Sequence, residues 1–127
     1  MRTERKDVVM NDFVGVMAKL KAVIEAENDF LSRGLPASLL DTTEAKSTLS
    51  DEYVQLGGEV AADKHVAGEV IADPALSKML VEASATLYAL SEENCDLLEG
   101  ALHATRRRVD AVMEAVRACK MHGEPTD

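Results

Sequence analysis

The chain has 127 residues, enough for one domain, and its composition already excludes several structural and functional classes. Aromatic residues make up only 3% and Trp is absent, so a core has to be built from aliphatic side chains, which favours packed helices over a β-sandwich. The formal net charge of −9 argues against binding to nucleic acid or to an anionic membrane surface, because both require clustered Lys and Arg.

Charge and hydropathy along the chain also bear on its compartment. Residues 37–73 carry two basic and eight acidic side chains, which we interpret as a solvated helix face. No apolar run approaches the roughly 20 residues of a membrane span. The basic first residues are not followed by an uninterrupted apolar stretch, so they do not form a secretory signal. We therefore expect a cytoplasmic protein.

The first predicted helix covers about residues 7–32. Its apolar residues recur at alternating spacings of three and four, which is typical of a helix that packs along a seam. These residues are Val9, Phe13, Val16, Met17, Leu20, Val23, Ile24, Phe30 and Leu31. Glu27 interrupts the seam, and Gly34 supplies a stop because glycine readily adopts the left-handed conformation that ends helices.

The second predicted helix covers about residues 36–72, and Pro36 suits its first turn. Lys46 is the charged member of its seam. The other members are Leu39, Leu40, Thr43, Leu49, Tyr53, Leu56, Val60, Ala67, Val70 and Ile71. Because Gly57 and Gly58 each disfavour a helix by about 1 kcal/mol relative to Ala, we expect a bend or a short loop near Gly57.

The third predicted helix covers about residues 74–121, with Asp73 as its N-cap and Pro74 at its first position. Asn94 is polar within a seam that is otherwise mostly apolar: Leu76, Leu80, Ala83, Leu87, Leu90, Leu97, Leu98, Ala101, Leu102 and Thr105. A flexible tail is expected over residues 122–127. The sequence therefore predicts a single all-α domain, an antiparallel three-helix bundle or coiled coil with a long C-terminal helix.

Helix lengths predict that the end of the third helix has no partner within the chain. A second helix of about 36 residues covers a third helix of about 48 residues only as far as about residue 110. The apolar stripe nevertheless continues through Val109, Val112, Met113, Val116 and Cys119. We interpret this stripe as a surface that binds another protein, with a second copy of the chain or burial within the chain as the alternatives.

Three polar residues at seam positions predict contacts between the helices. Glu27 and Lys46 lie on either side of the first connecting loop, within reach of an interhelical ion pair. Asn94 offers a polar contact from the third helix. Such groups fix the register of helices rather than add much stability. A catalytic Glu–Lys pair is the weaker alternative, because no nucleophile motif accompanies it.

Residues with the potential for metal or redox chemistry are few. The two His–Glu pairs have the spacing of solvated pairs on a helix face, and a zinc site needs about four converging ligands. These pairs are His65 with Glu69 and Glu99 with His103. Cys95 and Cys119 would lie about 36 Å apart on one helix, too far for a disulfide, and we interpret both as small apolar residues. We expect no cofactor, no metal and no enzymatic activity.

The only basic run is Arg106-Arg107-Arg108. Consecutive residues on a helix point about 100° apart, so the three do not form one patch. Surface ion pairs with Asp110 and Glu114 are the favoured interpretation. Recognition of an acidic partner is the alternative.

A pattern of sparse polar residues links the chain to a known family. The first helix ends in Ile24-Glu25-Ala26-Glu27-Asn28-Asp29-Phe30-Leu31, and the last helix carries Glu93-Asn94-Cys95-Asp96-Leu97-Leu98. With Leu39-Leu40 before Lys46 in the second helix, this order resembles the FlgN family of flagellar export chaperones. In that family an acidic residue, a Lys and an Asn recur at the places of Glu27, Lys46 and Asn94. The resemblance covers most of residues 8–120, although Gly57-Gly58 and the acidic middle segment are not drawn from it.

The resemblance implies a cytoplasmic chaperone without ATPase activity. Such proteins bind the terminal helical segments of hook-filament junction proteins and deliver them for export. The family assigns client binding to the C-terminal amphipathic helix, which corresponds here to the stripe from Val109 to Cys119. The alternative is a structural coiled-coil protein that has no client and forms a homodimer through the same stripe.

Overall fold

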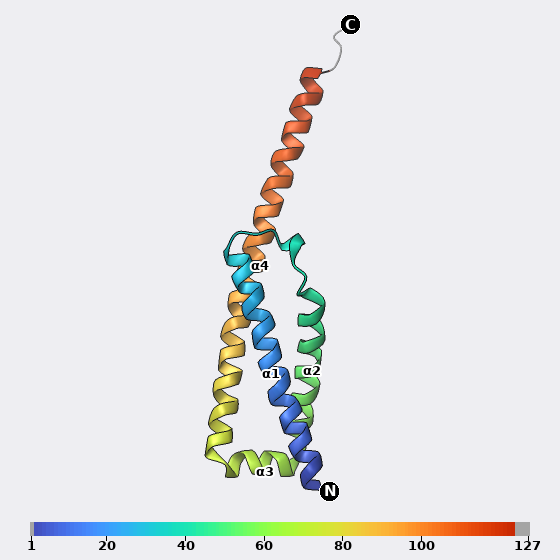
Figure 1. Cartoon of the computed structure of the whole chain (residues 1–127). Helices are drawn as coiled ribbons and strands as arrows, with labels where there is room; N and C mark the ends of the chain where they lie inside the picture. Colours follow the sequence, from blue (N-terminus) through green and yellow to red (C-terminus); the bar gives the residue numbers. More distant parts are fainter. Residues whose placement is uncertain (1, 124–127) are drawn as a thin grey trace.

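The structure, a computed structural model, describes the backbone of residues 2–123 and the side chains of residues 8–121. In that range every regular element is helical: α1 (Arg2–Ser32), the 3-10 turn η1 (Ala37–Leu39), α2 (Thr43–Ala62), α3 (Lys64–Ala72) and α4 (Pro74–Gly123). α1 and α4 run in the same direction and α2 runs in the opposite one (Figure 1). The predicted all-α bundle with a long C-terminal helix is confirmed.

The core is organised around α1, which lies against both other long helices. Its central cluster consists of Phe13, Met17, Leu20 and Ile24 from α1 together with Leu87 from α4. Partly buried residues of the neighbouring helices complete it, among them Leu49, Tyr53, Leu56, Val60, Leu80, Ala83 and Leu90. Full burial of such a side chain stabilises the fold by about 1.5 to 3 kcal/mol, so this cluster is the main apolar contribution to stability.

The second predicted helix proves to be η1, α2 and α3, and its breaks do not fall at the glycine pair. Residues 40–42 are not helical, and the second break lies at Asp63, where φ is −85° and ψ is 107°. The Asp63 carboxylate accepts hydrogen bonds from the backbone N–H groups of His65 and Val66, and so caps α3. The expected bend near Gly57 is wrong. Gly57 lies inside α2, at a point where a Cβ would be only 3.4 Å from the Phe13 ring.

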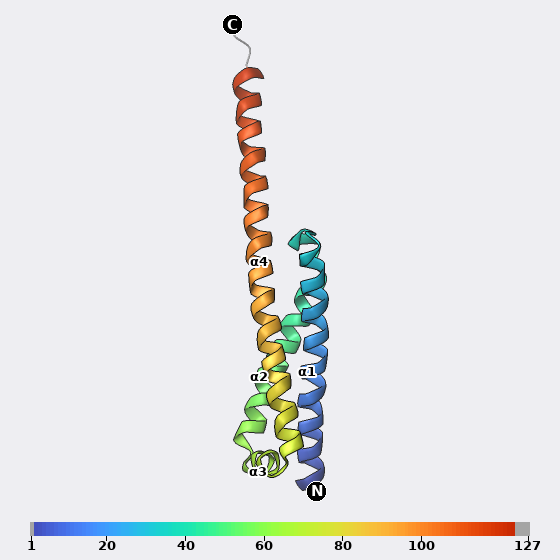
Figure 2. The same ribbon diagram turned by 90° about the vertical axis from the view of Figure 1, so that its left-hand side faces the viewer.

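The short helix α3 lies across one end of the bundle and joins α2 to α4 (Figures 1 and 2). Its change of direction alters which residues are buried. Val66 is 2% exposed, whereas Ile71, a predicted seam residue, is 81% exposed. Leu39 and Thr43 are likewise exposed, because the seam of a continuous helix does not extend over residues 36–43.

α4 is continuous from Pro74 to Gly123 and is capped by the carboxylate of Asp73, which accepts from the N–H groups of Ala75 and Leu76. Since α3 lies across the bundle, α2 covers less of α4 than its predicted length implied. Every residue of 105–121 is exposed, so the uncovered part begins before residue 110. We call residues 105–121 the α4 extension; at 1.5 Å per residue it is about 25 Å long.

The ends of the helical region differ from the predicted bounds. α1 begins at Arg2 rather than near Asp7, and α4 continues past Met121 to Gly123. Of the tail expected over residues 122–127, residues 124–127 lie outside the described residues. None of the helices in the described range has an apolar stretch long enough to cross a lipid bilayer.

Candidate functional site

The α4 extension presents its predicted partner-binding residues to solvent. The exposed fraction is 53% for Val109, 60% for Val112, 47% for Met113 and 53% for Val116, and Cys119 is exposed as well. We call these five residues the apolar stripe. Apart from the segment around η1 at its base, no other described segment runs beside this part of α4 (Figures 1 and 2). Scattered apolar residues are normal on a surface, whereas a contiguous row on one helix face is a candidate contact surface.

A shallow groove joins the apolar stripe to the bundle. Pro36 and Ser38 form one wall, and α4 from Thr105 to Met113 forms the other. The groove has a volume of about 410 Å³ and includes Val109 and Val112. A partner that lies along the stripe would therefore also contact the loop that follows α1.

Gly34 positions the wall of this groove. Its φ of 78° is the left-handed conformation expected after a helix, and its N–H donates to the carbonyl oxygen of Leu31 at 3.0 Å. The chain then leaves α1 and reaches Pro36, whose extended backbone precedes η1. The short turn holds this segment against the base of the α4 extension.

Glu27, Lys46 and Asn94 come together in one buried network between α1, α2 and α4. The Lys46 Nζ donates to Glu27 Oε1 at 2.8 Å and to Asn94 Oδ1 at 3.0 Å. Asn94 Nδ2 donates to Glu27 Oε1 at 3.2 Å. Glu27 is 1% exposed and Asn94 is 5% exposed. The ion pair expected from the sequence is thus present, and the third seam residue joins it.

Asn28 belongs to the network but was not singled out from the sequence. Its side-chain oxygen accepts a hydrogen bond from Asn94 at 2.9 Å, and its Nδ2 donates to the carbonyl oxygen of Leu90 at 3.1 Å. The seam spacing contained a signal for it. Asn28 follows Ile24 by four residues and precedes Leu31 by three, so it is as well placed for burial as Glu27.

Thr42 completes the network from outside any helix, where no periodicity marks it. Its hydroxyl donates to Glu27 Oε2 at 2.8 Å. Burial by itself raises the pKa of Glu27, but hydrogen bonds from Lys46, Thr42 and Asn94, with the positive charge of Lys46, outweigh it and lower that pKa. Among the described side chains every buried polar atom has a hydrogen-bond partner. The arrangement is suited to holding three helices together rather than to proton transfer.

No family model, curated protein or solved structure matches the chain. The resemblance to the FlgN family therefore rests on the sequence pattern of Glu27, Lys46 and Asn94.

The basic run at residues 106–108 does not form the predicted ion pairs. Among the described side chains, the polar contact of these arginines is a hydrogen bond from Arg108 Nη2 to Thr105 Oγ1 at 3.3 Å. The ion pairs of the described residues lie elsewhere, in the bundle. Asp110 and Glu114 therefore leave the guanidinium groups available for contacts outside the chain.

The residues considered for metal and redox chemistry lie apart. In the part of the chain that the structure describes, no group of three or more His, Cys, Asp or Glu side chains is placed to hold a metal ion. Cys95 and Cys119 are both free thiols. Both are exposed, Cys119 within the apolar stripe, and they form no disulfide with each other.

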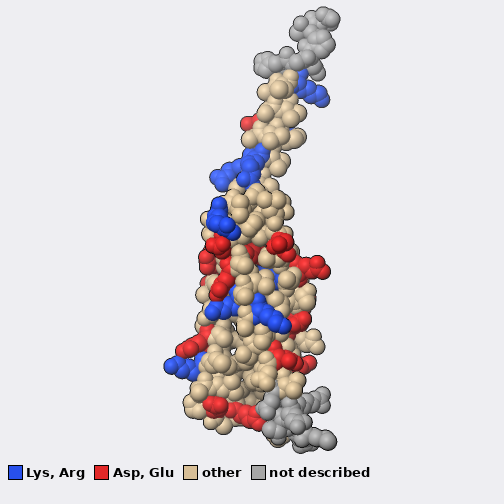
Figure 3. All heavy atoms as spheres, viewed as in Figure 1, with Lys and Arg blue, Asp and Glu red and all other residues tan. Residues whose placement is uncertain are grey.

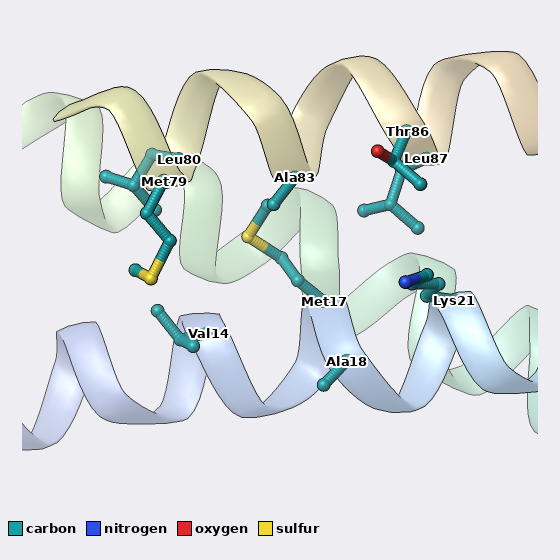
Figure 4. Close-up of a pocket in the computed structure, with 9 residues that line it drawn as sticks. All are labelled: Val14, Met17, Ala18, Lys21, Met79, Leu80, Ala83, Thr86 and Leu87. Atoms are coloured by element: carbon teal, nitrogen blue, oxygen red, sulfur yellow. The ribbon is translucent and has the colours of Figure 1, made fainter. Parts of the chain in front are cut away.

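A second cavity lies within the bundle, between α1 and α4. It has a volume of about 190 Å³. Figure 4 shows Val14 and Met17 of α1 facing Met79 and Ala83 of α4. Lys21 lies at one end of the cavity and pairs with Glu25 at 3.7 Å. Its mostly aliphatic lining is that of a gap in helix packing, so the α4 extension remains the candidate site.

Proposed function

We propose that the protein binds an amphipathic helical segment of a client protein along the α4 extension, in the manner of a flagellar export chaperone. The observation that carries the proposal is the exposure of the apolar stripe on the part of α4 that projects beyond the other described helices. A client helix seated there would bury apolar surface, which contributes about 25 cal/mol per Å² before the costs of association.

The form of the site supports this mode of binding. The recognising element is already a helix, so less ordering is required when the client arrives. Met113 adds a side chain that adapts to different apolar surfaces. The groove beside Pro36 and Ser38 gives the client a second contact at the base of the extension.

The sequence pattern supports the choice of client. The FlgN-like arrangement of Glu27, Lys46 and Asn94 goes with clients of the hook-filament junction type, whose terminal helical segments are shielded before export. In this proposal the protein acts in the cytoplasm, by binding alone, without a cofactor or a catalysed reaction.

Co-expression tests the proposal directly. The full chain should form a stable complex with the C-terminal segment of a hook-associated protein, measured by co-purification and calorimetry. The double variant Val112→Asp/Val116→Asp should abolish the complex, because it places two charges in the buried interface. Ala111→Asp/Ala118→Asp is the matched control, since both residues lie on the reverse of the same helix. Undiminished binding by the Val112/Val116 variant would contradict the proposal.

Self-association through the same stripe is the competing function. Sedimentation equilibrium separates the two. A tight homodimer that is lost in Val112→Asp/Val116→Asp, together with no client complex, would identify a structural coiled-coil protein instead.

A further inference from the structure

The apolar stripe lies on the basic part of an acidic protein. Residues 105–121 carry five basic and two acidic side chains, for a net charge of +3. Residues 1–104 carry nine basic and nineteen acidic side chains, for a net charge of −10. Figure 3 shows the same division, with Lys and Arg prominent on the extension and Asp and Glu spread over the bundle. A partner of the stripe therefore meets positive charge first.

Three of the five basic groups lie beside the stripe, whereas both acidic groups lie behind it. At about 100° per residue, Arg108 lies about 70° to one side of the stripe's centre, and Arg106 and Lys120 about 90° and 50° to the other. Asp110 and Glu114 lie about 130° and 170° away, on the reverse of the helix. Both edges of the apolar surface are thus positively charged, and its acidic residues point away from a partner.

These bordering cations are not neutralised within the described chain. Arg106 and Asp110 have the i, i+4 spacing of a helix pair, but the structure forms no ion pair there. Among the described side chains, Arg108 donates to the hydroxyl of Thr105. It also lines the groove beside Pro36 and Ser38, so a cation stands at the base of the docking surface.

A second copy of the chain fits this charge pattern poorly. In an antiparallel pair of extensions centred on Met113, Arg106 of one copy would lie opposite Lys120 of the other. In a parallel pair, the edge with Arg108 in one copy would meet the edge with Arg106 and Lys120 in the other. Like charges beside an apolar seam disfavour helix pairing, just as charges at the edges of coiled-coil seams set partner choice.

We infer that the helix bound by the α4 extension is one whose own apolar stripe is bordered by Asp and Glu. This inference rests on the proposed function and adds the partner's chemistry to it. Carboxylates on the partner would lie beside Arg106, Arg108 and Lys120 and form interhelical ion pairs. Such complementarity raises the association rate and selects the partner, and salt weakens it.

Two synthetic helical peptides test the inference with the full chain. Both carry the same Leu stripe at alternating spacings of three and four, and they differ only at the bordering positions, which are Glu in one and Lys in the other. Fluorescence anisotropy should show the Glu peptide binding about tenfold more tightly in about 0.05 M salt, with the ratio falling towards one in about 0.5 M salt. Equal affinities at low salt, or no binding of the Glu peptide, would overturn the inference.

Two neighbouring arginines supply a matched pair of variants with the same change in net charge. Arg108→Glu, at the border of the stripe, should weaken binding of the Glu peptide about fivefold, whereas Arg107→Glu, on the reverse, should change it less than about twofold. Equal losses would show that only net charge matters and would overturn the inference.

The double variant Val112→Asp/Val116→Asp separates this inference from the proposed function. Suppose that the double variant binds neither peptide, while the wild type binds both peptides equally. The stripe then binds helices, but the charges at its borders do not select among them. The inference then fails alone. If both peptides bind the double variant as they bind the wild type, the stripe is not the docking surface and both proposals fail.

Discussion

Over residues 74–104, α4 is packed against α1 and tied by Asn94 to a buried polar network, whereas over residues 105–121 every residue of the same helix is exposed. The spacing of apolar residues does not change where one region passes into the other. Leu87 is 5% exposed and Val112 is 60% exposed, although both occupy equivalent seam positions. Periodicity therefore shows which face of a helix can be buried. Which part of that face is buried depends on the lengths and directions of the other helices.

The largest difference between the two regions should come from the buried network. Lys46→Met leaves the Glu27 carboxylate buried without its cation, and we expect the free energy of unfolding to fall by about 3 to 5 kcal/mol. Urea unfolding followed by circular dichroism measures this change.

Lys21→Met is the matched control, because Lys21 forms an exposed ion pair with Glu25 at 3.7 Å. We expect its effect to stay below about 1 kcal/mol. A loss for Lys46→Met no larger than for Lys21→Met would mean that the network does not hold the bundle together.

Truncation of one aliphatic residue in each region should give the next largest contrast. Leu87→Ala leaves a cavity in the central cluster and should lower the free energy of unfolding by about 2 to 4 kcal/mol. Val112→Ala removes exposed surface only and should change it by less than about 0.5 kcal/mol. Comparable losses of stability, measured at low protein concentration, would show that the extension is packed in solution.

The smallest effect should come from titration of the network. Because the pKa of Glu27 is lowered in the folded protein, its ionised form stabilises the fold. That contribution is complete above the ordinary pKa of a Glu carboxyl, about 4.3, and is lost as the pH falls through the lower folded pKa.

Glu27→Gln removes this titration. The gap in unfolding free energy between the wild type and the variant should be constant from about pH 7 to pH 5 and should narrow below about pH 4. Urea unfolding over that pH range measures this difference. A difference in unfolding free energy that widened on acidification would contradict the lowered pKa of Glu27.

The fold could be predicted in its long helices but not in the segment between them. In α1 and α4 the spacing of three and four continues along the helix, with Glu27 and Asn94 as polar members of the seam, so spacing alone located both. The break at Asp63 was missed because its cause is a capping carboxylate without a neighbouring Gly or Pro. The stronger sequence signal at Gly57 instead lies inside α2, beside the ring of Phe13. Because α3 runs in a different direction from α2, the seam residues of one continuous helix no longer face the core there. Val66 is therefore buried, and the predicted seam residue Ile71 is exposed.

The polar residues could be predicted where they interrupt an apolar seam. Glu27, Lys46 and Asn94 did so, and the structure brings all three together. Thr42 reaches the same carboxylate from a non-helical segment, where no spacing rule applies. The stripe on the α4 extension was found from helix lengths, but its boundary moved from residue 110 to residue 105 because the direction of α3 cannot be inferred from composition.

The length of the α4 extension also decides which charges a partner encounters. A helix bordered by carboxylates would be repelled by a bundle with a net charge of −10. Physiological salt screens charges beyond about 8 Å, while Val112 and Val116 stand about 10 and 16 Å past Thr105 along the helix axis. The outer part of the apolar stripe, from Val112 to Cys119, thus stands where salt largely screens the charge of the bundle, so an acidic helix would meet little repulsion there.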